Sequence, residues 1–302
     1  MKFSMSPGLW PGVIAEVEAA GHTHVPVEEA EFLIYTGGPL PDPLPESIGF
    51  VQFVFSGVDR LLEAGVMRPG VRWANAAGVY GRPVAEVALT LLLAQLHHVK
   101  AATVAGSFRA RGPIDEAQGW LSDGPTVAII GAGGTADALI PLLRPFGVRI
   151  IAVNRSGRPV EGADETHAQS AADHVWEEAD AFVLAAPLTE ETSRMVDAPV
   201  LARMQPHAVL VNVGRGELID TDALVEALRS GRIAGAALDV TDPEPLPEDH
   251  PLWSLPNCTI TPHIAATGRI AQRMIAPQII ENAAAFAAGE RMPTEVDISL
   301  GY

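Results

Sequence analysis

Between about residues 125 and 263, six short apolar runs alternate with segments of helical periodicity. The runs are rich in β-branched residues and contain few polar ones, as is typical of strands that helices cover on both faces. They are TVAIIG, RIIAVN, DAFVLAA, AVLVNVG, GAALDV and CTITPH. We therefore predict a doubly wound α/β domain with a parallel sheet.

A second, smaller α/β domain is predicted from the first hundred residues, where the same pattern is weaker. Its candidate strands are EFLIYTG, FVQFVF and VRWANA, separated by turns rich in proline and glycine. A length of 302 residues suits two domains. The helical pattern near 268–288 follows the last strand of the larger domain, and we assign it to the smaller one. The expected domains are residues 1–97 plus 271–302, and residues 98–270.

Two helical segments carry clear end signals. DTDALVEALRSG has its N-cap at Asp220 or Thr221 and stops at Gly231, just past the last periodic apolar residue. The segment of residues 82–100 has Pro83 near its start and is apolar nearly all round. We expect it to be one buried helix that joins the domains or packs across a dimer.

Composition argues against several classes of protein. A formal net charge of −17 disfavours binding to nucleic acid or to an anionic membrane, because both need a cationic face. The only cysteine is Cys258, and no His-Glu-x-x-His spacing occurs, so neither a disulfide nor a metal site is expected. The longest apolar stretch, around 84–96, is interrupted by polar residues, which argues against a membrane span. We expect a cytoplasmic protein.

A glycine-rich turn predicts a dinucleotide site in the larger domain. In TVAIIGAGGTADALI, Gly131 and Gly133 follow a strand and precede a helix, with Gly134 and Thr135 completing the loop. Ala136 stands where the third glycine of the G-x-G-x-x-G/A motif would be. The first glycine permits a tight turn and the second lets the backbone approach a pyrophosphate, which the helix N-terminus attracts. The same glycines would also suit a turn without a ligand.

The next strand ends at Asn154, about 20 residues after this loop, where an acidic residue would bind the ribose hydroxyls of NAD. That acid is absent. Asn154 can hydrogen-bond an oxygen, Arg155 can pair with a phosphate, and Ser156 can donate a hydroxyl, with Arg158 as a further cation. We therefore predict a preference for NADP (NADPH), with NAD possible, although a solvated loop would have the same composition.

Three polar residues follow later strands of the predicted sheet, at the carboxyl edge where such sheets bind ligands. Arg215 lies between two glycines, which would let the backbone approach a ligand, and its guanidinium suits a carboxylate. Glu244 lies between two prolines, and His263 ends the following strand. A carboxylate beside a histidine fixes its tautomer and favours its protonated form, which makes a proton donor.

Each of these residues alone is more simply explained by an ordinary structural role, as a surface charge, an acidic turn residue or a hydrogen-bonded histidine. Their occurrence at successive strand ends behind a dinucleotide loop favours the catalytic interpretation. The pair His97 and His98, at a helix end, lacks such neighbours and is expected to be structural or exposed.

Over most of its length the chain resembles the D-isomer-specific 2-hydroxyacid dehydrogenases. The matching motifs are FVFSGVDRL, GAGGTA, APLTEETSRMV, VNVGRGELIDTDAL, the long segment 235–265 and the closing VDISLGY. The resemblance implies two Rossmann-like doubly wound domains with the substrate in a cleft between them. The domain of residues 1–97 plus 271–302 would bind the substrate, and that of residues 98–270 the dinucleotide.

The resemblance also implies roles for individual residues. Arg215, Glu244 and His263 would be catalytic, and Arg215 together with the backbone amides of Ser56 and Gly57 would bind the substrate carboxylate. Further cofactor-contact positions would be Pro187, Thr192, Val213 and Asp239, the last facing the nicotinamide.

Within the family, the NRS and DVTDPEPLP segments look closest to the glyoxylate and hydroxypyruvate reductases. The expected function is therefore reduction of a small 2-oxo acid to the D-2-hydroxy acid by a nicotinamide cofactor, in a homodimer. The alternative is a non-catalytic dinucleotide sensor of the corepressor kind, because the same fold serves that purpose. Turnover of NADPH with a 2-oxo acid would distinguish the two.

Overall fold

The structure is a computed structural model that describes residues 1–68 and 70–300. It divides into two compact units, one made of residues up to Tyr80 together with those from Ala266 onward, the other of Gly81–Ala265. The expected boundaries, after residues 97 and 270, differ from these. The helix that begins at Gly81 belongs to the larger unit, because its apolar side chains pack against the sheet of that unit.

The larger unit contains a seven-stranded parallel sheet in the order β12-β11-β10-β9-β6-β7-β8. Its strands are β6 (Thr126–Ile130), β7 (Arg149–Asn154), β8 (Glu165–Ala168), β9 (Ala181–Leu184), β10 (Val209–Asn212), β11 (Gly235–Leu238) and β12 (Cys258–Ile260). The predicted doubly wound sheet is thus confirmed. Its order reverses between β6 and β9, which is where such sheets bind ligands.

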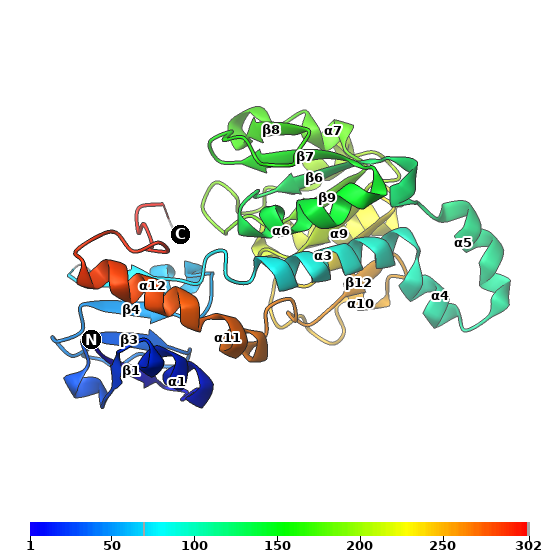
Figure 1. Ribbon diagram of the computed structural model, residues 1–302. Helices are drawn as coiled ribbons and strands as arrows, with labels where there is room; N and C mark the ends of the chain where they lie inside the picture. Colours follow the sequence, from blue (N-terminus) through cyan, green and yellow to red (C-terminus); the bar gives the residue numbers. More distant parts are fainter. Residues whose placement is uncertain (69, 301–302) are drawn as a thin grey trace. The chain divides into compact units, whose positions relative to one another are not determined.

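Helices cover both faces of this sheet. One face packs against α3 (Gly81–Leu96) and α6 (Gly134–Leu143), seen in front of the strands in Figure 1. The other face packs against α7 (Val175–Glu178), α8 (Ala198–Arg203), α9 (Thr221–Arg229) and α10 (Pro251–Ser254). Successive residues of β6 alternate between the two cores, with Val127 and Ile129 in one and Ala128 and Ile130 in the other. Double burial explains why the strands read as continuous apolar runs.

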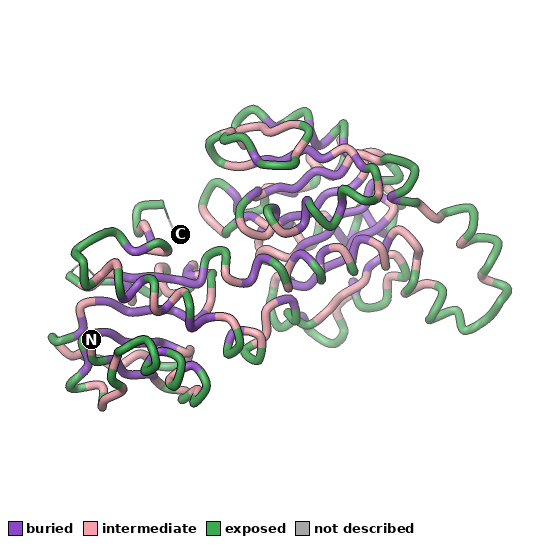
Figure 2. The backbone as a smooth tube through the Cα atoms, in the orientation of Figure 1, coloured by how far each residue is buried: buried purple, intermediate pink, exposed green. Residues whose placement is uncertain are grey.

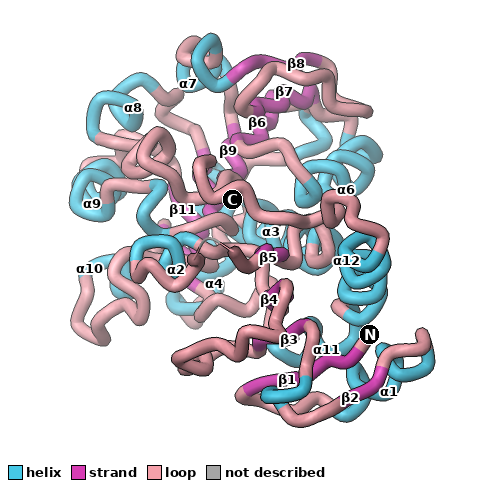
Figure 3. Tube along the Cα trace, turned by 90° about the vertical axis from the view of Figure 1, so that its left-hand side faces the viewer, coloured by secondary structure: helices cyan, strands magenta, loops and turns pink. Residues whose placement is uncertain are grey.

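The smaller unit contains a five-stranded parallel sheet in the order β2-β1-β3-β4-β5, which can be followed in Figure 3. Its strands are β1 (Lys2–Ser6), β2 (Thr23–His24), β3 (Phe32–Tyr35), β4 (Phe50–Phe53) and β5 (Arg72–Ala74), and its helices are α1 (Pro11–Ala19), α2 (Asp59–Glu63), α11 (Gly268–Met274) and α12 (Ala276–Ala287). The order 2-1-3-4-5 is one of the two common strand orders of doubly wound α/β sheets. The predicted second α/β unit is therefore also confirmed.

The C-terminal helix returns to the smaller unit through aromatic packing. Phe3, Phe32 and Phe50 lie on neighbouring strands and stack in a row, with ring centroids 5.6 and 4.7 Å apart. Phe286 of α12 extends this row, 4.8 Å from Phe50. The return explains why the unit is built from two separate stretches of the sequence.

The helix expected over residues 82–100 is shorter than predicted. It ends at Leu96, and His98 takes a left-handed φ of 50° before α4 (Val99–Ala105) begins. A further helix, α5 (Arg111–Ala117), follows, and no residue from 96 to 120 is buried (Figure 2). Among the described helices none alone is long and apolar enough to cross a membrane; α3 and α4 pass that test only as a pair bent by 57°.

Short 3-10 turns complete the fold. They are Val27–Glu29, Phe108–Ala110, Leu121–Asp123, Arg144–Phe146, Gln169–Ala171 and Gly216–Leu218.

Candidate active site

The glycine loop lies at the carboxyl end of β6, between that strand and α6. Gly131 has a φ of +94°, and a Cβ there would lie 2.2 Å from the backbone nitrogen of Ala186, which follows β9. Only glycine permits this close approach of the two loops at the reversal of strand order. A Cβ on Gly133, in contrast, would meet no atom within 4 Å.

These residues fit the pyrophosphate of a dinucleotide. Gly133 is the N-cap of α6. Because glycine has no side chain that could cap the helix, the first amides of α6 remain available to an anion. Gly134 and Thr135 form the first turn and are partly exposed. Ala136 is fully buried against the sheet, which shows that a methyl group is accommodated where the motif has its third glycine.

The side chain of Asn154 shapes the loop after β7. Its Oδ1 accepts hydrogen bonds from the backbone nitrogens of Ser156 and Arg158, at 3.2 and 3.1 Å, and its Nδ2 donates to the Arg158 carbonyl at 2.7 Å. We expected this side chain to bond a cofactor oxygen. In the structure its hydrogen-bonding groups are used within the loop, and Arg155, Ser156 and Arg158 are exposed there.

Pro187 and Thr192 belong to one loop after β9. Thr192 is buried, and its hydroxyl donates to the Pro187 carbonyl at 2.7 Å and accepts from the backbone nitrogen of Thr189 at 2.8 Å. Thr192 therefore holds the loop through its side chain, whereas Pro187 lies exposed next to Ala186. Val213, after the neighbouring β10, is half-buried and donates its amide to Leu184.

Arg215 is set in place by a residue that the sequence analysis did not single out. Asn212, fully buried at the end of β10, donates from Nδ2 to the Arg215 carbonyl at 2.7 Å and accepts from the Gly214 nitrogen at 3.0 Å. The Arg215 side chain is half-buried, and its Nη1 donates to the Gly214 carbonyl at 2.9 Å.

The glycines around Arg215 permit close packing against neighbouring loops. A Cβ on Gly214 would lie 2.9 Å from the carbonyl oxygen of Ala186, and one on Gly216 would lie 2.0 Å from the backbone of Thr241. These close approaches lock the turn of Arg215 against the segment that leads to Glu244.

His263 and Glu244 form the predicted pair. The His263 Nδ1 lies 2.8 Å from Glu244 Oε1, and the two side chains are 45% and 32% exposed. Because β10, β11 and β12 are neighbours in the sheet, Arg215, Glu244 and His263 follow adjacent strands at one edge. The contact between the carboxylate and the imidazole occupies Nδ1 and leaves Nε2 as the ring nitrogen for an exchange of protons.

Asp239 anchors the segment that carries His263. It is 1% exposed, and its Oδ1 accepts hydrogen bonds from the Thr261 hydroxyl at 2.6 Å and the Ile264 nitrogen at 2.9 Å. Its Oδ2 accepts from the Ala265 nitrogen at 3.0 Å, and its own carbonyl accepts from the His263 nitrogen. His263 has a left-handed φ of 51°, an uncommon conformation that these bonds hold.

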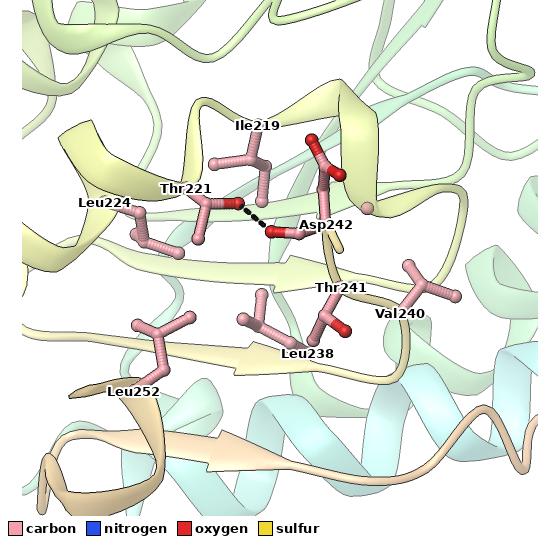
Figure 4. A pocket seen from close by; sticks show the side chains of 9 residues that line it. Ile219, Thr221, Leu224, Leu238, Val240, Thr241, Asp242 and Leu252 are labelled. Carbon is pink, nitrogen blue, oxygen red and sulfur yellow. Dashed lines mark hydrogen bonds between the residues drawn. The ribbon is translucent and has the colours of Figure 1, made fainter. Parts of the chain in front are cut away.

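Figure 4 shows a small cavity behind this edge, lined by nine residues that include Thr221, Leu238 and Thr241. The Thr221 hydroxyl donates to the Asp242 carbonyl at 2.8 Å and so ties α9 to the segment that leads to Glu244. A volume of about 10 Å³ is the size of one water, so this cavity is a packing gap and not a substrate pocket.

In the smaller unit, Ser56 and Gly57 follow β4. Ser56 is exposed and Gly57 is half-buried. Within residues 1–68 and 70–300, no hydrogen bond is donated by the backbone nitrogen of either residue. Two such amides in sequence suit an anionic group such as a carboxylate.

Comparisons with known proteins agree with this geometry. The model of the D-isomer specific 2-hydroxyacid dehydrogenase NAD binding domain matches residues 87–265. The chain is 51% identical over 305 residues to an uncharacterized protein encoded in the proB 3′ region of Corynebacterium melassecola, with 100% of both chains covered. It is 33% identical over 256 residues to the glyoxylate reductase/hydroxypyruvate reductase of Homo sapiens, which covers 80% of this chain and 75% of that relative.

A solved structure shares the fold over the whole chain. The D-isomer specific 2-hydroxyacid dehydrogenase from Xanthobacter autotrophicus Py2, determined in complex with NADPH and MES, has a TM-score of 0.85 and 26% identity, with 100% of this chain and 99% of that chain covered. The match of the NAD binding domain alone spans more than half of the present sequence. The chain therefore belongs to the D-isomer specific 2-hydroxyacid dehydrogenase family and is an NAD(P)-dependent oxidoreductase.

Proposed function

We propose that the protein reduces a small 2-oxo acid of the glyoxylate or hydroxypyruvate kind to the D-2-hydroxy acid, with NADPH preferred. The observation that carries this proposal is the pair of His263 and Glu244, 2.8 Å apart at the carboxyl edge of the larger sheet. The human relative named above is a glyoxylate reductase/hydroxypyruvate reductase, which supports the substrate class.

In the proposed reaction, Arg215 and the backbone amides of Ser56 and Gly57 hold the substrate carboxylate. A bound reduced nicotinamide supplies the hydride that the carbonyl carbon receives. His263 donates a proton from Nε2 to the carbonyl oxygen, and Glu244 orients the imidazole through its contact with Nδ1. One hydride and one proton thus convert the 2-oxo acid into the 2-hydroxy acid.

The preference for NADPH rests on the loop after β7. Arg155, Ser156 and Arg158 are exposed there, and the loop of residues 154–158 contains no carboxylate that would repel a 2′-phosphate. Asn154 contributes indirectly, because its side-chain hydrogen bonds to the backbone of Arg158 fix the shape of the loop that carries these exposed residues. The Xanthobacter relative was solved with NADPH, in line with this preference.

A panel assay tests the proposal. Purified protein is incubated with NADPH or NADH and with glyoxylate, hydroxypyruvate or phenylpyruvate, and oxidation of the cofactor is followed by absorbance. We expect oxidation with at least one of the first two acids and a higher kcat/KM with NADPH than with NADH. Equal use of both cofactors would contradict the assigned preference, and absence of oxidation with both glyoxylate and hydroxypyruvate would contradict the substrate class.

We also propose a cytoplasmic homodimer in which residues 99–120, which include α4 and α5, bind a second copy. Val104 and Phe108 are 74% and 97% exposed, and Trp120 is 51% exposed, so this segment offers apolar area that a partner would cover. Light scattering after gel filtration should give twice the chain mass for the wild type and a lower mass for Phe108→Asp. A monomeric wild type at micromolar concentration would refute the dimer.

A further inference from the structure

A buried network of polar side chains lies behind the loops of the smaller unit that contain Ser56 and Gly57. Gln52 on β4 and Asn282 on α12 are fully buried, and Asn75, directly after β5, is 4% exposed. Buried amides of this kind persist only where their donors and acceptors are paired.

The network runs from α12 to the end of β5. Asn282 Nδ2 donates to Gln52 Oε1 at 2.6 Å and to the Thr294 hydroxyl at 2.7 Å. Gln52 Nε2 and the Thr294 hydroxyl both donate to the Asn75 carbonyl, at 2.8 and 2.7 Å. The backbone nitrogen of Asn75 donates to the Thr294 carbonyl at 3.0 Å. The backbone of Asn75 is therefore held from two sides, which leaves its side chain to act on the loops.

The Asn75 side chain bridges the loop after β4 and the loop after β5. Its Nδ2 donates to the Ser56 carbonyl at 2.8 Å, and its Oδ1 accepts from the Ala77 nitrogen at 3.0 Å. Two further bonds join the same loops, from the Ser56 hydroxyl to the Ala76 carbonyl and from the Ala76 nitrogen to the Phe55 carbonyl, both at 3.0 Å.

The bond to the Ser56 carbonyl has a consequence for the next amide. The Ser56 carbonyl and the Gly57 nitrogen belong to one planar trans peptide, in which C=O and N–H point in opposite directions. Holding the carbonyl on Asn75 therefore turns the N–H of Gly57 away from Asn75. Without this bond the glycine, which has little conformational restriction of its own, could rotate the peptide.

We infer that Asn75 is a positioning residue that aims the Gly57 amide at the carboxylate of the substrate. This inference rests on the proposed function for the identity of the ligand, but the orientation of the peptide depends only on the contacts within the smaller unit. Gln52, Asn282 and Thr294 support Asn75 and so connect the C-terminal segment to carboxylate binding.

Two nearly isosteric variants test the inference by kinetics. Asn75→Asp keeps an acceptor for Ala77 but loses the donor to Ser56, whereas Thr294→Val removes one support of the Asn75 backbone. We expect the KM for glyoxylate to rise on the order of tenfold in Asn75→Asp and less in Thr294→Val, because one buried hydrogen bond is lost. The kcat and the dissociation constant of NADPH should change little, since the lost interaction acts on carboxylate binding.

Asn257→Asp is the matched control. Asn257, in the larger unit, also donates from its side chain to a backbone carbonyl, that of Leu228 at 3.1 Å, but lies at the opposite end of β12 from His263. Its KM for glyoxylate should match the wild type. Unchanged KM values in folded Asn75→Asp would overturn the positioning role.

Hydrogen exchange measured by mass spectrometry gives a second readout that needs no turnover. Peptides that contain the Ala76 amide, which donates to the Phe55 carbonyl and so joins the two loops, should exchange about tenfold faster in Asn75→Asp than in the wild type, while peptides of β1 and β3 should not change. If the wild type reduces no 2-oxo acid but this difference is found, the proposed function fails and the positioning role stands. Equal exchange in both proteins overturns the positioning role whatever the activity.

Discussion

At the scale of single residues, the most informative side chain is Asp239. A carboxylate that is 1% exposed is costly to bury unless several donors surround it, and the Thr261 hydroxyl and the nitrogens of Ile264 and Ala265 provide them. The resemblance to the dehydrogenases implied a cofactor contact for Asp239. The structure adds that its carboxylate stabilises the left-handed turn at His263.

The variant Asp239→Asn tests this anchoring. An amide nitrogen in place of one carboxylate oxygen would face an N–H or O–H donor, so one bond is replaced by a repulsive contact. We expect a loss of about 1 to 3 kcal/mol in the free energy of unfolding, measured in urea, together with a lower kcat. The control Asp249→Asn changes an exposed carboxylate and should leave both values unaltered. Wild-type stability and kcat in Asp239→Asn would refute the anchoring role.

At the scale of elements, the loop between β7 and β8 determines the proposed cofactor preference. Its shape comes from Asn154, whose side chain bonds to Ser156 and Arg158 within the loop. The exposed side chains of Arg155, Ser156 and Arg158 are those that we propose to bind the 2′-phosphate. The sequence could not show that Asn154 shapes the loop while the other side chains remain exposed, because all of these residue types can bind a phosphate.

Replacement of Arg155 separates the two cofactors. In Arg155→Ala we expect the KM for NADPH to rise on the order of tenfold or more, because a charge-assisted bond to the 2′-phosphate is lost. The KM for NADH should stay within about twofold of the wild type, since NADH has no 2′-phosphate and the charge-assisted bond does not apply to it. Arg229→Ala, which removes an exposed arginine paired with Glu226 on α9, serves as the control. Equal losses with both cofactors would show that Arg155 does not read the phosphate.

At the scale of the whole molecule, most of the larger sheet, three strands of the smaller sheet and the glycine loop could be predicted, because doubly buried strands leave long apolar runs in the sequence. Strands β1 and β2 were not among the predicted strands. The strand β8 (Glu165–Ala168) was missed because it is a half-buried edge strand of mixed composition. The break at His98 was missed because the apolar pattern continues across it. Asn75 and Asn212 were missed because their function depends on contacts, and an asparagine at the end of a strand or directly after one carries no sequence signal of its own.

The pH dependence of stability is predicted from the smaller unit. Burial, and then the nearby N-terminal amine, hold the pKa of His22 below its ordinary value, whereas Glu31 acts in the opposite direction. The His22 Nδ1 is buried without a hydrogen-bond partner among the described residues, and the ring packs edge-on against Phe32. The unfolded chain therefore binds a proton at His22 more readily than the folded chain does. The contribution of neutral His22 to the free energy of unfolding is complete above about pH 6.5 and is lost as the pH falls below that value.

We expect the thermal midpoint to decrease between pH 7 and pH 5, measured by circular dichroism, and to decrease less in His22→Phe, which keeps an aromatic ring but cannot be protonated. An identical pH profile in that variant would show that His22 does not contribute.

We propose that His263, paired with Glu244, donates the proton in a reduction by a nicotinamide cofactor. The turnover of NADPH with glyoxylate in His263→Ala, compared with the wild type and with His207→Ala, tests this role. His207 is a suitable control because it also pairs with a carboxylate, that of Asp180 at 2.6 Å, but at the amino end of β10. We predict that kcat falls by about 100-fold to 10,000-fold in His263→Ala and is unchanged in His207→Ala. Wild-type turnover in His263→Ala would contradict the claim.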